Sequence, residues 1–404
     1  MENCHILIAG ISWPPETFLS RLMGGLLDEN IHITVAAAQR PADEWLKRPG
    51  FRWLQTPRWE GNIPLRLIKL GSMALKAFFC EQRDIHLFSP YAQNASSNAL
   101  RRLRFWNRLL PFAGHRWDVI YFPWNSGAIE HLPLFDFKIP VVVSCRESQI
   151  NIAPHNPERK AMRDGLAKIL RRATAIHCVS KAIAREVQQY AQCLNKTTVI
   201  FPAVDPDFFC LPSEPKQSNF FEVITIGSLI WRKGYEYALS AIHKLVARGG
   251  PVRFHILGDG PERQRLLYTI HDLGLENEVQ LHGRVSLEQV RELLQQADVF
   301  LLSSLSEGIS NAVLEAMACG LPVVTTDCGG MREAVTDGVE GFVVPVRDVD
   351  AMSSALQRLW KEPALKVKFG QNGRLRVISD FSLANQVFKF IDLMNLAQTL
   401  HHNA

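Results

Sequence analysis

The sequence has few of the features that mark specialised classes of protein. Its eight cysteines are scattered without a Cys-x2-Cys pair, and no apolar run approaches the ~20 residues that a membrane-spanning helix needs. Isolated thiols of this kind indicate a reducing compartment and exclude a zinc ribbon or a disulfide-stapled fold. No metal-ligand cluster, internal repeat or low-complexity tract is evident. We therefore expect neither a metal nor a cofactor.

The first ten residues lack a basic leader and are typical of a buried strand that ends at a glycine. We therefore expect no signal peptide and a cytoplasmic protein. With 404 residues, of which 47% are apolar and 21% charged, the chain has the composition of a soluble globular protein. Its length predicts two or three domains.

Short apolar runs alternate with helix-like stretches along both halves of the chain. In the second half we predict strands at 223–227, 254–258, 279–281, 299–302 and 322–325, with helices beginning near residues 233, 261, 286, 310 and 331. In the first half we predict strands near residues 6, 33, 119, 141 and 176, with helices after residues 15, 156 and 180. Continuous apolar strands separated by helices predict parallel sheets that are covered on both faces.

The polar stretch 211–219 contains two prolines and is typical of a linker. It separates a first Rossmann-like domain, 1–210, from a second, 220–382, which is followed by a last helix over about 383–404. Two doubly wound sheets that face each other would form a cleft at the carboxyl ends of their strands, where such folds bind ligands.

The net charge of +5 is unevenly distributed. Between residues 61 and 117 only Glu81 and Asp84 oppose the basic residues, which are Arg66, Lys69, Lys76, Arg83, Arg101, Arg102, Arg104, Arg108 and Arg116. Apolar residues recur at helical spacing in the same stretch. Such helices either lie on an anionic membrane surface or pack their apolar faces into the core. No nucleic-acid-binding motif accompanies the charge.

Two carboxylates, Glu307 and Glu315, flank a predicted helix start with seven residues between them. Gly308 permits close approach of a ligand to the backbone, and Ser310 and Asn311 are favourable N-cap residues. Unpaired amides at a helix start form an anion site. A diphosphate on these amides, with neighbouring hydroxyl groups donating to the two carboxylates, would suit this arrangement.

This pattern resembles the Glu-x7-Glu signature of retaining glycosyltransferases of family 4, and the chain resembles their exopolysaccharide-type members. The resemblance implies an α/β protein with the GT-B fold, in which two Rossmann-like doubly wound domains face each other across a cleft. It implies that 1–210 is the acceptor domain, that 220–382 is the nucleotide-sugar donor domain, and that the last helix, about 383–404, packs back on the acceptor domain. It also implies a nucleoside-diphosphate sugar as donor, with Glu307 near the sugar hydroxyls and Glu315 on the ribose. The donor-binding amides would be those of Gly308, Ile309, Ser310 and Asn311.

The loop after the first strand of the second domain carries two adjacent cations, Arg232 and Lys233. Breaking a bond between a sugar and a diphosphate leaves negative charge on the departing phosphate, which fixed cations stabilise. The family places an arginine after the first glycine of this loop, Gly227, and a lysine before the last glycine. Lys233 matches the lysine, but Ser228 replaces the arginine. We therefore expect Arg232 to supply the missing charge.

Further loops match the family in order and spacing over about 222–348. Gly258 ends a strand, either as part of the donor site or as a simple turn residue. In related enzymes the following loop touches the base through its main chain, which here belongs to Arg284 and Val285. In the first domain Gly10 ends the first strand and would pass close to the donor.

Four residues are predicted to lie on the acceptor side. Trp13 and Glu16 either contact the acceptor or are a buried tryptophan and a helix-start glutamate. Arg146 occupies the place where many family members have a histidine next to the reacting sugar. It would bind an acidic or phosphate-bearing acceptor, or else pair with Glu147. Trp124 would stack on a sugar ring.

These observations predict a metal-independent hexosyltransferase of the EC 2.4 type, acting in polysaccharide biosynthesis. It would move a hexose from a nucleoside-diphosphate sugar to a glycan or lipid-linked acceptor, with Glu307, Lys233 and Arg232 as the catalytic residues. No general base is needed when the leaving phosphate accepts the acceptor proton. Two alternatives stay open: a nucleotide-sugar epimerase or hydrolase, and a non-catalytic donor-binding partner of another transferase. The basic stretch adds the prediction of peripheral contact with the inner membrane surface.

Overall fold

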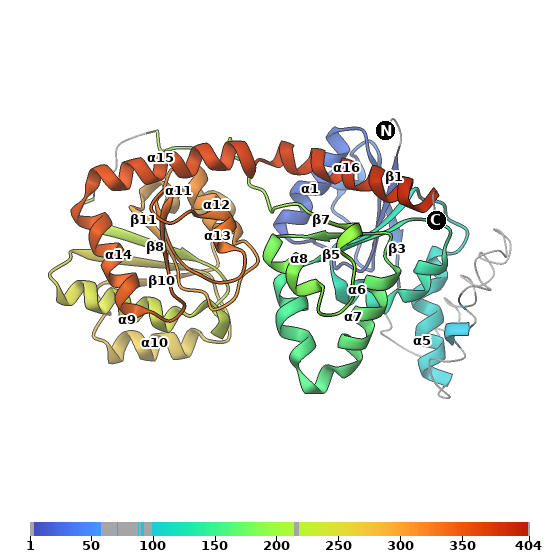
Figure 1. The fold of residues 1–404 in the computed structure, drawn as a ribbon, viewed down its shortest axis with the longest axis horizontal. Helices are drawn as coiled ribbons and strands as arrows, with labels where there is room; N and C mark the ends of the chain where they lie inside the picture. The colour runs from blue at the N-terminus through green and yellow to red at the C-terminus, as the bar shows by residue number, and fades with distance from the viewer. Residues whose placement is uncertain are drawn as a thin grey trace. The chain divides into compact units, whose positions relative to one another are not determined.

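The chain forms two compact units, each built around one parallel sheet (Figure 1). The computed structural model describes residues 4–57, 71, 88, 90–92, 99–213 and 218–402. Unit 1 comprises Met1–Cys178, Ala184–Ile200 and Val387–Ala404, and unit 2 comprises Val179–Ile183 and Phe201–Gln386.

The sheet of unit 1 has seven parallel strands in the order β3-β2-β1-β4-β5-β6-β7. They are β1 (His5–Ile8), β2 (His32–Ala37), β3 (Phe51–Gln55), β4 (Val119–Phe122), β5 (Val141–Cys145), β6 (Ala175–Cys178) and β7 (Thr197–Val199). The helices are α1 (Thr17–Asp28), α2 (Asp43–Leu46), α5 (Ala99–Leu109), α6 (Asn125–Glu130), α7 (Lys160–Arg172) and α8 (Lys181–Val187), whose first turn is assigned to unit 2. Every residue of β4 and β5 is buried, as expected for apolar strands covered on both faces.

The strand order of unit 1 reverses between β1 and β4, so the loops after these strands meet at the carboxyl edge of the sheet. Gly10 follows β1 and Gly127 lies in α6, and their backbones touch. An ideal Cβ on Gly10 would lie 2.6 Å from the Cα of Gly127, and the φ of Gly10 is +71°. Both the close approach and the left-handed backbone therefore require glycine at position 10.

The sheet of unit 2 has six parallel strands in the order β10-β9-β8-β11-β12-β13. They are β8 (Phe221–Ile226), β9 (Val252–Leu257), β10 (Val279–Gly283), β11 (Val299–Leu302), β12 (Val323–Thr326) and β13 (Gly341–Val344). The helices are α9 (Tyr235–Ala247), α10 (Arg263–Asp272), α11 (Leu287–Gln296), α12 (Asn311–Ala318), α13 (Met331–Ala334), α14 (Val349–Lys361) and α15 (Pro363–Asp380).

Unit 2 buries two apolar clusters, one on each face of its sheet. Leu239 of α9 and Leu266 of α10 belong to one cluster, and Leu294 of α11 and Met317 of α12 belong to the other. Figure 1 shows α9 and α10 on one side of this sheet and α11, α12 and α15 on the other. The strand order reverses between β8 and β11, so the loops after these two strands are the expected ligand-binding loops of unit 2.

The last helix, α16 (Leu383–His402), starts in unit 2 and continues in unit 1. Val387 packs against α1, since a Cβ on Gly25 would lie 2.5 Å from Cγ2 of Val387. Phe390 is 1% exposed and its ring lies 4.8 Å from that of His177 and 5.7 Å from that of Tyr121, measured between centroids. Residues of α16 are therefore part of the core of unit 1.

Most predicted elements are confirmed, but several elements were not predicted. The five strands expected in each half are present, and the elements that were not predicted are β3, β7, β13, α2, α6, α14 and α15. Of the basic stretch, Arg66, Lys69, Lys76 and Arg83 lie outside the described residues. At its described end Leu109 and Leu110 are buried in the core, whereas Leu100 is 48% exposed. None of the helices in the described ranges combines the length and apolarity needed to cross a membrane.

Candidate functional site

The loops at the carboxyl edge of unit 2 are held together by close backbone contacts. A Cβ on Gly258 would lie 2.0 Å from the carbonyl oxygen of Gly227, and one on Gly329 would lie 1.7 Å from that of Glu307. The φ values of Gly258 and Gly329 are +136° and +55°. Glycine is therefore required at both positions, and Gly258 serves to join the loops after β8 and β9.

The structure brings together two of the residues predicted to be catalytic, Lys233 and Glu307. Nζ of Lys233 donates a hydrogen bond to Oε1 of Glu307, and Oγ of Ser304 donates to the same oxygen at 2.8 Å. The side chains of Lys233 and Glu307 are only 13% and 6% exposed. Because solvent screens this ion pair less than a surface pair, it holds the carboxylate in a defined orientation.

Backbone contacts between the loops after β8 and β11 position this ion pair. Gly234 ends the short 3-10 turn Trp231–Lys233 with a φ of +60°, and a Cβ there would lie 2.4 Å from the carbonyl oxygen of Ser303. Oγ of Ser303 donates to the carbonyl of Lys233 at 2.9 Å. Arg232 accepts a hydrogen bond from the amide of Leu305 at 2.7 Å through its carbonyl oxygen, so its backbone also joins the two loops.

The start of α12 lies directly after Glu307. Ser310 occupies the N-cap position, but its side chain makes no cap hydrogen bond, whereas Ser286 caps α11 with a full capping box. Oδ1 of Asn311 is buried and has no hydrogen-bond partner among the described residues. The backbone N–H groups at this helix start have no side-chain cap and are therefore available to an anionic ligand, whereas Oδ1 of Asn311 is an acceptor that suits a ligand hydroxyl.

The remaining donor-side residues lie around this helix start. Gly308 accepts a hydrogen bond from the amide of Gly330 at 2.8 Å, which joins the loops after β11 and β12. Ile309 and Glu315 are buried, with exposed fractions of 8% and 9%. The other donor-side residues of unit 2 lie in the loops after β8 and β10, namely Ser228, which is exposed, and Arg284 and Val285.

Sequence reasoning missed three residues that shape the site. Ser304 orients Glu307, Gly329 touches its backbone, and Tyr235 donates to the carbonyl of Gly227 at 2.9 Å. Burial and the nearby Glu307 carboxylate raise the pKa of Tyr235, so its hydroxyl stays protonated. The polar residues that directly follow the apolar strand β11 were the available signal for Ser304.

At the carboxyl edge of unit 1, Arg146 lies against aromatic rings. Its Cζ is 3.8 Å from the ring centre of Phe18 and 5.4 Å from that of Trp124. Burial lowers the pKa of Arg146, whereas Tyr121 and the carboxylates of Glu147 and Glu16 raise it. Arg146, Trp124 and Glu16 are thus neighbours, and the guanidinium makes cation–π contacts with two rings.

Trp13 differs from the other predicted acceptor-side residues because it is 7% exposed. Its ring packs edge-on against Trp45 with 5.7 Å between centroids and lies 6.0 Å from that of Phe51. The structure therefore supports the interpretation of Trp13 as a core residue. Glu16 is exposed at the N-cap of α1.

Two kinds of chemistry find no support in the described part of the chain. No group of three or more His, Cys, Asp or Glu side chains there is arranged to hold a metal ion. The described cysteines are free, and burial raises the pKa of Cys328, next to Glu307 and Lys233, to about 12. Its thiol is therefore protonated at neutral pH and is a poor nucleophile.

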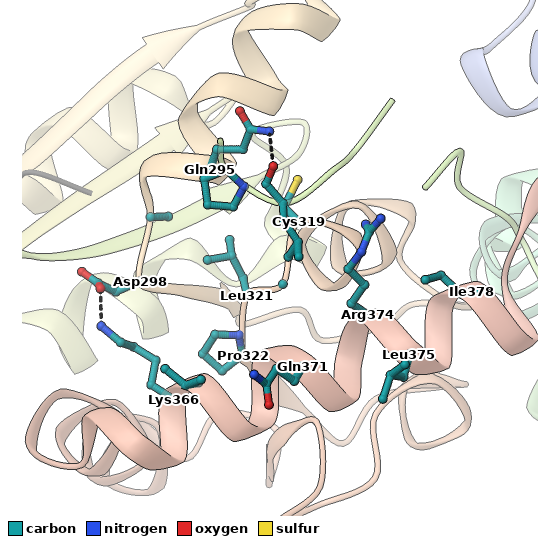
Figure 2. A pocket seen from close by; sticks show the side chains of 15 residues that line it. Gln295, Asp298, Cys319, Leu321, Pro322, Lys366, Gln371, Arg374, Leu375 and Ile378 are labelled. Carbon is teal, nitrogen blue, oxygen red and sulfur yellow. Dashed lines mark hydrogen bonds and ion pairs between the residues drawn. The ribbon is translucent and has the colours of Figure 1, made fainter. Parts of the chain in front are cut away.

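A separate hollow of about 790 Å³ opens elsewhere in unit 2 (Figure 2). Asp298 directly precedes β11 and Pro322 directly precedes β12, so the hollow lies at the amino edge of the sheet, opposite the loops described above. Nε2 of Gln295 donates to the carbonyl of Cys210 at 3.0 Å, and Lys366 forms an ion pair with Asp298. None of the residues predicted to bind the donor or the acceptor lines this hollow.

Comparisons with known proteins cover both halves of the chain. Residues 211–376 match the family described as Glycosyl transferases group 1, and residues 16–208 match Glycosyltransferase Family 4. The amylovoran biosynthesis glycosyltransferase AmsK of Erwinia amylovora is 31% identical over 212 residues, which are 51% of each protein. WcaL of Salmonella typhimurium, whose name links it to colanic acid biosynthesis, is 38% identical over 141 residues, which are 33% of this chain and 35% of WcaL. The chain thus spans about half or less of the length of these relatives.

A solved structure resembles the chain over nearly its whole length. Anabaena Alr3699/HepE, in complex with UDP, aligns with a TM-score of 0.70 and 18% identity, covering 98% of this chain and 100% of that one. This likeness concerns the fold, and it confirms the prediction of two doubly wound units of the GT-B type. The two family matches together span most of the chain, and on these matches the chain belongs to the glycosyltransferases of group 1 and family 4.

Proposed function

We propose that the chain is a metal-independent, retaining hexosyltransferase that uses a nucleoside-diphosphate sugar as donor and a glycan or lipid-linked acceptor. The observation that carries this proposal is the contact between Lys233 and Glu307 beside the start of α12, where the Ser310 side chain makes no cap hydrogen bond. A cation, a carboxylate and helix-start amides within one group of loops suit a ligand that is anionic at one end and hydroxylated at the other.

The proposed roles follow from the charge of each group. Lys233 and Arg232 stabilise the leaving diphosphate, Glu307 accepts hydrogen bonds from the sugar hydroxyls, and Glu315 binds the ribose. Without a donor, Glu307 neutralises Lys233. The donor then brings phosphate oxygens to Lys233 and hydroxyl donors to Glu307, so that each charged group keeps a partner of suitable polarity. In unit 2 the donor-binding backbone is that of Gly227, Ser228, Gly258, Arg284, Val285, Gly308, Ile309, Ser310 and Asn311.

The proposed reaction needs no metal and no protein base. The bond between the anomeric carbon and the phosphate oxygen breaks, and a bond forms between that carbon and an acceptor hydroxyl oxygen. The acceptor proton goes to the leaving phosphate oxygen. The protein contributes positioning and fixed positive charge at the departing phosphate.

On the acceptor side we assign contacts to Trp124, Arg146 and Glu16, which are neighbours at the carboxyl edge of unit 1. An indole face binds the apolar face of a sugar ring, and a carboxylate accepts from its hydroxyls. The UDP complex of HepE makes uridine-diphosphate sugars the first donors to test. We also propose that the protein contacts the membrane surface peripherally through its basic stretch, on the cytoplasmic side.

Substitution of the paired residues tests the proposal. Lys233→Ala and Glu307→Ala should each lower the rate of sugar transfer by about 10²–10³, the usual effect of removing one group that stabilises transition-state charge. The measurement is product formation from uridine-, guanosine- and adenosine-diphosphate sugars with a panel of glycan and lipid-linked acceptors.

Lys244→Ala is the matched control, because Lys244 forms an exposed ion pair with Asp350 in the same unit. It should transfer sugar at the wild-type rate. Wild-type turnover in both Lys233→Ala and Glu307→Ala would contradict the assigned roles. Isomerisation or hydrolysis of the donor by the wild-type chain at the same rate with and without acceptor would contradict the transferase assignment, as would donor binding without turnover.

A further inference from the structure

A hollow of about 460 Å³ lies at the carboxyl edge of unit 1. Ala38 directly follows β2, and Thr56 and Pro57 directly follow β3, so the ends of two parallel strands form one wall. Helix α5 supplies Arg104 and Arg108 to the same lining. The carboxyl edge is the side on which doubly wound sheets bind their ligands.

The charge of this hollow comes from arginines. Helix α5 carries Arg101, Arg102, Arg104 and Arg108 and no acidic residue. Arg108 lies 3.5 Å from the carboxylate of Glu130, and both side chains are largely exposed, at 43% and 61%. Within the described part of the chain no ion pair joins Arg104, so the hollow has one more positive than negative charge.

The histidine in the lining does not change this balance. His131 is buried, its Nδ1 lies 2.8 Å from the carbonyl oxygen of Gly127, and burial lowers its pKa to about 4. It is therefore neutral at neutral pH. The positive charge of the hollow therefore comes from Arg104 and Arg108 alone.

Backbone carbonyl groups hold helix α5 and the side chain of Arg108 in place. Nδ2 of Asn107, which is 5% exposed, donates to the carbonyl of Pro57 at 3.0 Å, joining α5 to the loop after β3. Nη1 of Arg108 donates to the carbonyl of Glu130 at 3.2 Å, joining α5 to the end of α6. Such preorganisation lowers the entropy cost of binding a ligand.

We propose that Arg104, Arg108 and Thr56 bind a phosphate or diphosphate group of the acceptor. Two guanidinium groups on one helix face match the several oxygens of a tetrahedral anion better than they match a neutral sugar. A dianion would also compensate Arg108 for any loss of its contact with Glu130. The proposal rests on the proposed function, since it names the chemical class of that acceptor.

The first experiment measures binding of inorganic pyrophosphate to the full chain by calorimetry. It uses Lys233→Ala as the background, so that the loops of unit 2 bind pyrophosphate less well. Adding Arg104→Gln or Arg108→Gln should raise the Kd by about tenfold. Adding Arg101→Gln, which removes the same charge from an exposed position of α5 outside the hollow, should leave it unchanged. An equal loss in all three variants, or no loss in any, would overturn the proposal.

The second experiment separates an acceptor phosphate from a lipid headgroup. Arg104→Gln should raise the KM for a phosphate-bearing acceptor about tenfold without changing the KM for the same glycan lacking phosphate. Flotation with phosphatidylglycerol vesicles at low salt should respond equally to Arg104→Gln and Arg101→Gln. A selective loss of flotation in Arg104→Gln, with unchanged acceptor KM, would overturn the proposal in favour of a headgroup site. Absence of sugar transfer with intact, Arg104-dependent pyrophosphate binding would contradict the proposed function and the acceptor role, but not the anion site.

Discussion

The two units build the carboxyl edges of their sheets in different ways. In unit 2 the loops meet through glycine backbone, as at Gly258 against Gly227 and Gly329 against Glu307. In unit 1 the backbones of Gly10 and Gly127 also touch at this edge, but beside them Arg146 lies on aromatic rings and, in the layer beneath, Phe390 packs against a buried histidine.

Because of this difference, the two units should tolerate different kinds of substitution. A backbone contact leaves no room for a methyl group, so a single added carbon displaces a loop. A cluster of rings depends on total volume and shape, so it tolerates similar side chains and is damaged mainly by truncation. Unit 2 should therefore be most sensitive to small-to-large changes, and unit 1 to large-to-small changes and to buried charge.

The largest expected effect is the loss of a ring from unit 1. Phe390→Ala should destabilise unit 1 by about 3–5 kcal/mol, because it leaves a cavity against His177 and Tyr121. Urea unfolding followed by tryptophan fluorescence measures this, since only Trp231 and Trp360 of the nine tryptophans belong to unit 2. Unit 2 should still bind the donor at urea concentrations below the unfolding transition.

Phe388→Ala provides the matched control, because Phe388 lies on the same helix and is 63% exposed. Its effect should stay within about 0.5 kcal/mol. Similar losses for the two substitutions would mean that α16 does not complete the core of unit 1.

A single methyl group should have the next largest effect, in unit 2. Gly329→Ala places a Cβ 1.7 Å from the carbonyl oxygen of Glu307 on a backbone with a φ of +55°. We expect a cost of about 3 kcal/mol and a displaced Glu307 loop. Calorimetric titration with UDP and the rate of transfer should both show the loss.

Gly274→Ala isolates the contribution of backbone strain. Gly274 has a φ of +64°, but a Cβ there would have no atom within 4 Å. It should cost only about 1 kcal/mol and leave UDP binding unchanged. Equal effects of the two substitutions would argue against a steric role for the contact between Gly329 and Glu307.

The smallest of the three effects concerns buried charge in unit 1. Burial lowers the pKa of His131 to about 4 and that of His177 to about 3. An unfolded histidine takes up a proton near pH 6.5, whereas these folded histidines do so only near pH 3–4. The unfolded state therefore binds more protons in this window, and stability falls as the pH falls, by about 2 kcal/mol for each histidine at pH 5.

Urea unfolding of unit 1 at pH 7 and pH 5 measures this loss. His131→Asn keeps a donor for the carbonyl of Gly127 and removes one titrating group. The drop in stability between the two pH values should then be smaller by about 2 kcal/mol. An unchanged drop would show that folded His131 takes up its proton at the same pH as an unfolded histidine.

The same contrast explains what the sequence could predict. The loops of unit 2 can be recognised in the sequence, because a backbone contact requires glycine at a fixed position such as Gly258. The sequence predicted that Lys233 and Glu307 belong to one site, and they form an ion pair. The fold class followed from continuous apolar strands separated by helices.

The parts that were not predicted depend on long-range side-chain packing. Strand β3 has only exposed or partly buried residues after Phe51, and β7 has only three residues, so neither has the continuous apolar pattern. Ser304 could not be linked to Glu307 until the loop conformation was known. No sequence spacing distinguishes a core tryptophan such as Trp13 from a partly exposed one such as Trp124.

The split assignment of α16 has a consequence for how the protein is made. Phe390 and its neighbours belong to the core of unit 1, yet the ribosome produces them only after the whole of Phe201–Gln386. Tyr121 and His177 therefore lack their contacts with Phe390 while roughly half of the chain is translated. Unit 2 has no such delay, so it should reach its native packing first although it lies later in the chain.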